Sequence, residues 1–240
     1  MQKHMKTVLL YVEIFVGNLL RHIFSRKNPS HGFFIQIDGG EGAGKDTVID
    51  KLKVKYPYVE FSREPGGTPY AEEMRAVMLD SKLARDANAL TQMLLVTAGR
   101  SDHMHRKAEH VILGGRSFVS NRGSITSWGY QIGGQEGGYA LKKLFFQIHR
   151  AIYTKVSPDL YVILEVDPKE GARRVAERKG EMNHYDERKT DFHLRVMKAY
   201  RTFGTLFPFK VKFVDANKSR DDVFAQVDAI VSPFLSKTAK

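Results

Sequence analysis

Four glycines and one lysine carry the clearest chemical signal in the sequence. They lie within the segment from Phe33 to Ile49, FFIQIDGGEGAGKDTVI, between a short apolar run and a helix-like stretch. The glycines are Gly39, Gly40, Gly42 and Gly44. Because glycines leave successive backbone N–H groups unobstructed, a turn of this kind can surround phosphate oxygens. The spacing Gly39-x-x-x-x-Gly44-Lys45 is therefore typical of a phosphate-binding loop.

The residues that follow the glycines add charge. Lys45 supplies a full positive charge, and a helix beginning at Thr47 would supply its positive dipole end. The residue after the lysine is ordinarily Ser or Thr, whose hydroxyl binds Mg²⁺, whereas this chain has Asp46. A glycine turn that binds nothing is the alternative, and we favour phosphate binding because four glycines and a lysine coincide between a strand and a helix.

Five apolar runs predict the β-strands that position this loop. They are Phe33–Ile37, Tyr58–Phe61, Ser117–Ser120, Leu160–Val166 and Val211–Val214. The gaps between them predict helices at Thr47–Tyr56, Tyr70–Leu79, Ala89–Leu113, Ala140–Val156, Lys169–Lys179, Thr190–Phe207 and Asp221–Leu235. Alternating strands and helices imply a parallel sheet covered by helices on both faces. Ligands bind at the carboxyl ends of such strands, so we expect binding residues in the loops that follow them.

The composition predicts one domain with an anionic partner. The 240 residues suffice for one buried core, and their net charge of +11 fits either nucleotide phosphates or nucleic acid. The basic residues are spread along the chain without a zinc, RRM or KH signature, which argues against nucleic acid. The sequence has no cysteine, which excludes disulfides, thiolate catalysis and Cys-ligated metals. This composition is compatible with a reducing, cytoplasmic setting.

Residues 1–32 are an extension that precedes the predicted fold. Their apolar stretch, Val8 to Phe24, is interrupted too often for a membrane span and has no small-residue cleavage site. The interrupting residues are Glu13, Asn18, Arg21 and His22. We expect an amphipathic helix that packs on the domain or on a partner subunit. Attachment of residues 8–24 to a membrane surface is a second interpretation, and a misplaced gene start is a third.

Several motifs resemble those of thymidylate kinases, in the order in which that family has them. They are GGEGAGK, REPGGTP with the following AEEMRAVML, TAGRSDH, NRGSITSWGYQ, PDLYVILEV, RRVAERKGE and a late VDA turn. The match covers about residues 33–235, and REPGGTP is the most specific part because few other phosphate-binding proteins contain it. The resemblance implies an α/β fold over residues 33–240. That fold is a P-loop NTPase three-layer sandwich, with a five-stranded parallel sheet and helices on both faces.

The resemblance also implies a reaction and its partners. Thymidylate kinases transfer the γ-phosphoryl group of ATP to dTMP with Mg²⁺, giving dTDP, and form homodimers through helices packed face to face. Lys45 would bridge the transferred group, and Asp46 and Glu64 would lie at the metal. The expected ATP-binding residues are Gly39, Gly40, Glu41, Gly42, Ala43, Gly44, Lys45, Asp46 and Thr47.

The acceptor nucleotide would be bound by residues of the later motifs. Arg75 and Arg122 match the arginines that hold the acceptor phosphate, a role suited to the planar guanidinium group, and Arg122 is also expected to be catalytic. Glu41 matches the acid at the 3′-hydroxyl of the sugar. The residues expected around the base are Arg100, Thr126, Ser127 and Gln131.

A basic segment at about residues 173–188 resembles the lid that closes on ATP. The family has two variants, and a chain with Gly42 after the loop acid resembles the one whose catalytic charges lie in the lid. Arg178 is the first choice for the charge that reaches the phosphates, followed by Lys179 and Arg173. For Arg174 and Arg188 we expect positions on a solvated face, paired with acidic neighbours.

The chain departs from the family pattern at several site positions. Asn121-Arg122-Gly123 stands where the family commonly has Asp-Arg-Tyr, and Val96 stands where it often has a phenylalanine that stacks on thymine. We hypothesise that the carboxylate of Asp46 compensates for the one missing at Asn121.

These departures keep two alternatives open. One is a nucleotide-binding interaction module with impaired catalysis, and the other is a kinase for a different deoxynucleoside monophosphate. Retention of the residues expected to bind both substrates favours catalysis on dTMP. These residues are Glu41, Lys45, Arg75, Arg100, Arg122 and Gln131.

Overall fold

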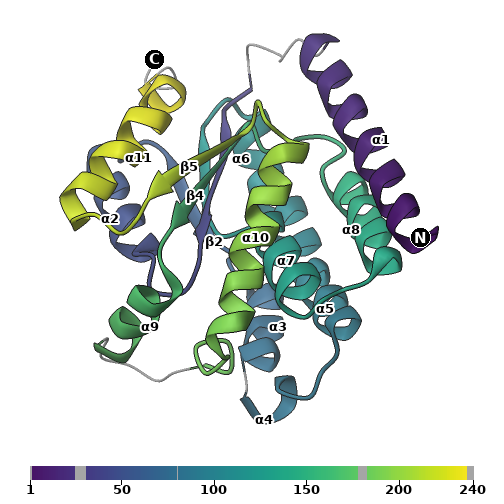
Figure 1. The fold of residues 1–240 in the computed structure, drawn as a ribbon. Helices are drawn as coiled ribbons and strands as arrows, with labels where there is room; N and C mark the ends of the chain where they lie inside the picture. The colour runs from purple at the N-terminus through teal and green to yellow at the C-terminus, as the bar shows by residue number, and fades with distance from the viewer. Residues whose placement is uncertain (1, 25–30, 80, 178–182, 237–240) are drawn as a thin grey trace.

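The computed structural model describes residues 2–24, 31–79, 81–177 and 183–236 (Figure 1). Its centre is a five-stranded sheet in the order β2-β3-β1-β4-β5. The strands are β1 (Phe34–Gly39), β2 (Glu60–Arg63), β3 (Phe118–Asn121), β4 (Leu160–Glu165) and β5 (Val211–Asp215). Every pairing is parallel, and all six residues of β1 are buried. The carboxyl ends of the central strands therefore meet at one edge, where the glycine loop begins.

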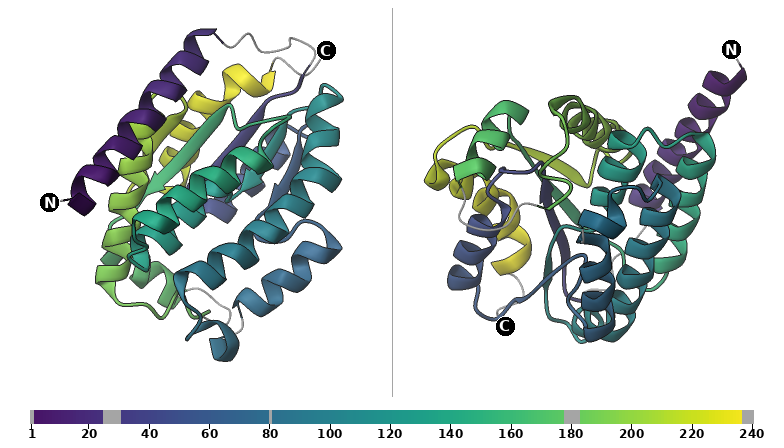
Figure 2. Two further views of the ribbon diagram at one scale, coloured as in Figure 1. Left: turned by 90° about the vertical axis from the view of Figure 1, so that its right-hand side faces the viewer. Right: turned by 90° about the horizontal axis from the view of Figure 1, so that it is seen from below.

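Helices cover both faces of the sheet, as the alternation of strands and helices predicts. In Figure 2 (right), α2 (Lys45–Lys55) and α11 (Arg220–Leu235) lie on one side of the strands. On the other side lie α5 (Ala89–His103), α8 (Tyr139–Ile152) and α10 (Thr190–Leu206). The remaining helices are α3 (Pro69–Leu79), α4 (Ser81–Ala84), η1 (Met104–Ala108), α6 (Glu109–Leu113), α7 (Ser124–Ser127), η2 (Trp128–Gly134) and α9 (Pro168–Glu177). The predicted three-layer α/β architecture is confirmed.

The segment after β3 differs from the prediction, which assigned it to a loop. Residues from Ser124 to Gly134 instead form α7 and the π-helical η2, packed closely on α10. A Cβ at Gly129 would lie 2.5 Å from the ring of Tyr200, and one at Gly133 would lie 2.4 Å from Ala199. These glycines lower helix propensity but permit the close approach, so tertiary packing determines the helix here.

The N-terminal extension forms a helix, α1 (Gln2–Phe24), that begins earlier than the predicted Val8. It packs against α8 and α10 at the side of the molecule (Figures 1 and 2). Tyr11 and Ile14 are partly buried against the core beneath them. No helix in the described part of the chain is long and apolar enough to cross a membrane.

Candidate active site

The glycine loop joins the end of β1 to the start of α2 and surrounds the side chain of Lys45. Gly42 and Gly44 have φ values of +71° and +83°, which favour glycine. A Cβ at Gly42 would lie 2.2 Å from the carbonyl oxygen of Gly171 in α9, so the loop also needs glycine there for close packing. All nine residues expected to bind ATP, from Gly39 to Thr47, lie in this loop and the first turn of α2.

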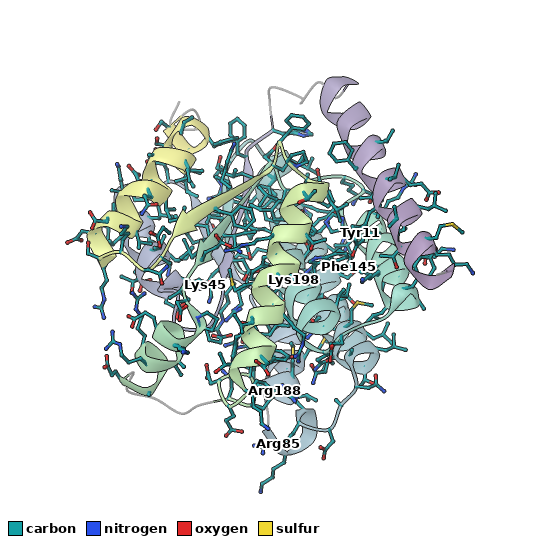
Figure 3. The ribbon with its side chains drawn as sticks, in the orientation of Figure 1. Tyr11, Lys45, Arg85, Phe145, Arg188 and Lys198 are labelled. Carbon is teal, nitrogen blue, oxygen red and sulfur yellow. The ribbon has the colours of Figure 1, made fainter. Side chains whose placement is uncertain are left out.

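Lys45, labelled in Figure 3, is buried, and its hydrogen bonds turn the ammonium group back toward its own loop. Nζ donates hydrogen bonds to the carbonyl oxygens of Gly40 at 2.6 Å and Gly39 at 3.1 Å. Burial is the main cause that lowers the pKa of Lys45 to about 8, and the neighbouring charge of Arg122 adds to it. An anion in the loop would oppose both effects, because it stabilises the charged ammonium.

Glu41 and Arg122 form the charged centre of the site. Nη2 of Arg122 donates to Oε1 of Glu41 at 2.7 Å, and the hydroxyl of Tyr130 donates to the same oxygen at 2.6 Å. Burial by itself raises the pKa of Glu41, but the charges of Arg122 and Lys45 outweigh it and bring the pKa to about 2. Glu41 is therefore ionised at any physiological pH and holds Arg122 in place.

Asp38 lies beneath the glycine loop at the end of β1 and contacts Arg122 of this charged centre. The sequence analysis did not identify it. It is fully buried, with Oδ1 accepting from the backbone N–H of Gly39 at 2.8 Å and from the hydroxyl of Tyr200 at 3.0 Å. Thr126 donates to Oδ2, and Nη1 of Arg122 lies 3.7 Å from Oδ1. The available signal was an acid inside a buried strand, directly before the glycines, which needs several buried partners.

A cavity of about 440 Å³, including solvent at its mouth, opens beside Glu41 and Arg122. Of the residues expected at the acceptor, five line it: Glu41, Arg75, Arg122, Thr126 and Gln131. Pro65, Met78, Leu79, Tyr130, Asn183 and Tyr185 complete the wall. Charged groups, apolar surface and amides thus meet in one cavity.

Arg75 reaches this cavity from α3, as the sequence analysis expected. Its Nη1 donates to the carbonyl oxygen of Pro65 at 3.1 Å, which fixes the guanidinium group against the loop after β2. Partial burial is the main cause that lowers the pKa of Arg75, and the charges of Arg63 and Arg122 add to it. Two arginines therefore face one cavity with mutual repulsion, an arrangement that an anion between them would relieve.

Arg100 and Ser127 do not line the cavity, in contrast to the expected contact with the base. Arg100 is 3% exposed and lies behind the wall, where Nε donates to Oε2 of Glu64 at 2.5 Å. Its Nη2 donates to the carbonyl oxygen of Gly123 at 2.8 Å and to Oγ of Ser127 at 3.0 Å. The buried carboxylate draws the guanidinium inward, because an unpaired charge there would be costly.

The same pairing buries Glu64, the second residue expected at the metal. Glu64 is 2% exposed and lies between Arg100 and His103, whose Nδ1 is 3.5 Å from Oε1. His103 in turn contacts Oγ of Ser62 through Nε2 at 2.8 Å. Glu64 is therefore a buried ion-pair partner in this structure, and its carboxylate does not reach the cavity wall.

Asp46, directly after the loop lysine, and Asn121 contact each other. Nδ2 of Asn121, at the end of β3, donates to Oδ1 of Asp46 at 2.7 Å. Asp46 is exposed, and Oδ1 of Asn121 has no hydrogen-bond partner among the described residues. No cluster of three or more potential metal ligands occurs within the described residues. A carboxylate and an amide oxygen are nevertheless the hard donors that Mg²⁺ takes, alongside water and phosphate.

A group of amides and tyrosines closes the far end of the cavity. The hydroxyl of Tyr185 donates to Oε1 of Gln92 at 2.7 Å, and Nε2 of Gln131 donates to the Tyr185 hydroxyl at 3.1 Å. The rings of Tyr130 and Tyr185 meet edge to face at 5.1 Å. Val96 is buried in the core and does not line the cavity. The aromatic surface here thus comes from tyrosines that the sequence analysis did not assign.

The basic segment expected to be a lid is described only in part. Arg178 and Lys179 lie outside the described residues. Arg173 is exposed and pairs with Glu170 at 2.8 Å and Glu177 at 2.5 Å, which does not favour a role at the phosphates.

Of the two arginines expected to pair with acidic neighbours, Arg174 does so, whereas Arg188 donates to a backbone carbonyl that is distant in sequence. Nε of Arg174 pairs with Oε1 of Glu170 at 2.7 Å, and Nη1 donates to the carbonyl oxygen of Ala216. Arg188 lies near Arg85 (Figure 3) and donates to its carbonyl oxygen at 3.3 Å. Both arginines therefore serve packing between elements in this structure.

The fold and the site together define a P-loop nucleoside monophosphate kinase. The family model for thymidylate kinase matches residues 37–227, and this chain belongs to the thymidylate kinase family. Thymidylate kinase of Ruegeria pomeroyi is 30% identical over 211 residues, covering 86% of this chain and 98% of that protein. Those of a Marinomonas species and of Lactobacillus delbrueckii subsp. bulgaricus are each 32% identical, covering 82% and 81% of this chain and 92% of each relative.

Proposed function

We propose that the protein transfers the γ-phosphoryl group of ATP to dTMP, giving dTDP. The observation that carries this proposal is the shared cavity of Glu41, Arg75 and Arg122, which opens beside the glycine loop that begins at Gly39. Phosphoryl transfer requires positioning of two anionic ligands and neutralisation of oxygen charge, with little covalent chemistry by the protein. Arg75 and Arg122, which face one cavity, can position the acceptor phosphate.

In this proposal the loop from Gly39 to Thr47 holds the ATP phosphates. Lys45 would exchange its bonds with the loop carbonyls for phosphate oxygens, which would keep the ammonium charged. Arg122 would contact the acceptor phosphate while Glu41 orients it and meets the 3′-hydroxyl. Asp46 is the proposed ligand for Mg²⁺, which supplies charge neutralisation at the phosphates when bound. Arg178 remains the proposed lid charge, outside the described residues.

The base would lie at the end of the cavity formed by Tyr130, Gln131 and Tyr185. Oε1 of Gln131 is buried without a hydrogen-bond partner among the described residues, so it can accept from a base N–H. A buried acceptor of this kind disfavours a base edge that leaves it unpaired. Thr126 would contribute through its hydroxyl, while Arg100 and Ser127 would support the wall from behind.

The proposal extends to the setting of the enzyme. By resemblance we propose a homodimer formed by helices packed face to face, and a cytoplasmic location, with which the cysteine-free sequence is compatible. Sedimentation of the purified chain tests the first part. A monomer at all concentrations would contradict the dimer without affecting the proposed reaction.

A coupled assay with ATP, Mg²⁺ and each of dTMP, dUMP, dCMP and dGMP tests the proposed reaction. We expect the highest kcat/KM with dTMP. Phosphorylation of none of the four would favour a binding module, and a preference for another acceptor would favour a different deoxynucleotide kinase. The inward position of Arg100 makes this comparison informative, because the arginine expected at the base does not line the cavity.

A further inference from the structure

The N-terminal helix α1 has an inner face that the domain covers. The ring centroid of Tyr11 lies 6.1 Å from that of Trp128, and Phe145 of α8 contacts the same Trp128 at 5.4 Å. Figure 3 shows Tyr11 and Phe145 close together where α1 meets α8. Lys142 lies over the ring of Tyr11 at 5.5 Å. These contacts fix the rotation of α1, so its opposite face points outward.

The outer face of α1 is strongly apolar. Among the described residues it exposes Met5, Val8, Leu9, Val12, Phe15 and Val16, which are between 38% and 58% exposed. Single exposed hydrophobic residues are common on protein surfaces, but a contiguous row along one helix marks an interaction surface. The row from Met5 to Val16 extends along about 18 Å of the helix.

The spacing of this row indicates what covers it. Met5, Leu9, Val12 and Val16 follow one another at intervals of four, three and four, and the sequence continues the pattern at Leu19 and Ile23. This is the a and d spacing of a heptad repeat, which places an apolar seam against another helix, and Val8 and Phe15 widen the seam on its g side. A helix that lies on a lipid surface has a broad apolar face bordered by basic residues, whereas the border of this face includes the exposed acid Glu13.

Two charges beside the seam select the orientation of that second helix. Lys6 and Glu13 both occupy e positions and are both exposed. If two α1 helices pair antiparallel, with Met5 opposite Val16 and Leu9 opposite Val12, then Lys6 of one copy lies beside Glu13 of the other. The two-fold symmetry of such a pair creates this contact twice. A parallel pair would place Glu13 beside Val8 instead.

We propose that α1 forms an antiparallel helix pair with α1 of a second copy of this chain. The seam lies outside residues 37–227, which match the family model, so it is a different surface from the helices proposed for the family-type dimer. It also contains none of the residues assigned to phosphoryl transfer. The pairing can therefore fail while the proposed reaction holds, and the reverse is equally possible.

Charge reversal in the full-length chain tests the pairing. Lys6→Glu places two acids on the e edge, and Glu13→Lys places two bases there, so each variant alone should associate through α1 on the order of tenfold more weakly. The double variant Lys6→Glu/Glu13→Lys should restore association. A mixture of the two single variants should also associate, because each then supplies the charge that the other needs.

Sedimentation equilibrium reads out these effects. The control is Lys53→Glu, the same charge change at an exposed lysine of α2 on the other face of the sheet, which should leave the mass distribution unchanged. Single variants that sediment like the wild type would overturn the proposal. A second result would also overturn the proposal. If the wild type bound vesicles rich in anionic lipid, and neither single variant changed the sedimenting mass, α1 would face a membrane.

Cross-linking distinguishes the two orientations. The chain has no cysteine, so single cysteines can be placed without background. A mixture of Leu9→Cys and Val12→Cys should form a disulfide-linked heterodimer under mild oxidation. Efficient linkage of Val12→Cys to itself, with no linkage in the mixture, would indicate parallel helices and overturn the antiparallel arrangement.

Discussion

The side chain of Asn121 donates a 2.7 Å hydrogen bond to Asp46, joining the end of β3 to the first turn of α2. These are the two positions at which the chain departs from the family pattern beside the loop lysine, and they lie in contact. The family commonly has an acid at the first position and a hydroxyl residue at the second. In this chain the carboxylate belongs to Asp46 at the loop, and the neutral amide belongs to Asn121 on the strand. This exchange of positions supports the hypothesis of charge compensation.

Asp46→Thr should therefore lower activity in an otherwise unchanged protein. The substitution restores the usual hydroxyl but removes the carboxylate, so we expect kcat to fall by on the order of tenfold and the Mg²⁺ requirement to rise. Titration of activity with Mg²⁺ measures both effects. The double variant Asp46→Thr/Asn121→Asp should recover most of the loss, and Asp50→Asn on the exposed part of α2 serves as the control. Higher activity in Asp46→Thr would refute the compensation.

Arg122→Lys should weaken use of the acceptor. Lysine keeps the charge but cannot bond to Glu41 and a phosphate with the fixed donors of a guanidinium group. We expect kcat/KM for dTMP to fall by on the order of a hundredfold. Steady-state kinetics measure this change, with Arg173→Lys on the solvated face of α9 as the matched control. Equal effects of the two substitutions would count against a special role for Arg122.

Arg100→Met should act mainly on stability. It leaves Glu64 buried without its ionic partner, at a cost of about 3–5 kcal/mol in the free energy of unfolding. Adding Glu64→Leu should recover much of this loss, because the second substitution removes the uncompensated charge. Urea denaturation measures both variants. An Arg100→Met protein of normal stability with a raised KM for dTMP would instead indicate direct contact with the base.

The lowered pKa of Lys45 predicts how stability depends on pH. The folded protein releases this proton near pH 8, whereas an unfolded lysine keeps it up to about pH 10.4. Between these values the unfolded state binds more protons, so this residue makes the folded state more stable as pH rises through the window, by on the order of 3 kcal/mol in total. Wild-type and Lys45→Met proteins, compared by urea denaturation at several pH values, should differ by this rise. Parallel pH profiles would contradict it.

The sequence predicts the scaffold better than the orientation of its buried charges. Apolar runs locate all five strands, and the glycine spacing locates the loop around Lys45, because both depend on local patterns. The inward turn of Arg100 depends on Glu64, which is distant in sequence, and no local pattern reveals it. The helical form of Trp128–Gly134 depends on packing against α10. Residues whose role is fixed by a distant partner are the ones that sequence reasoning misplaced or missed.

The central claim is that a donor and an acceptor phosphate meet over one loop. A single molecule that joins adenosine and thymidine through a pentaphosphate tests it most directly. We predict that this compound binds more tightly than ATP or dTMP alone, competes with both, and loses affinity in Arg122→Lys. Competition with only one of the two nucleotides, or binding no tighter than the stronger of them, would contradict the account.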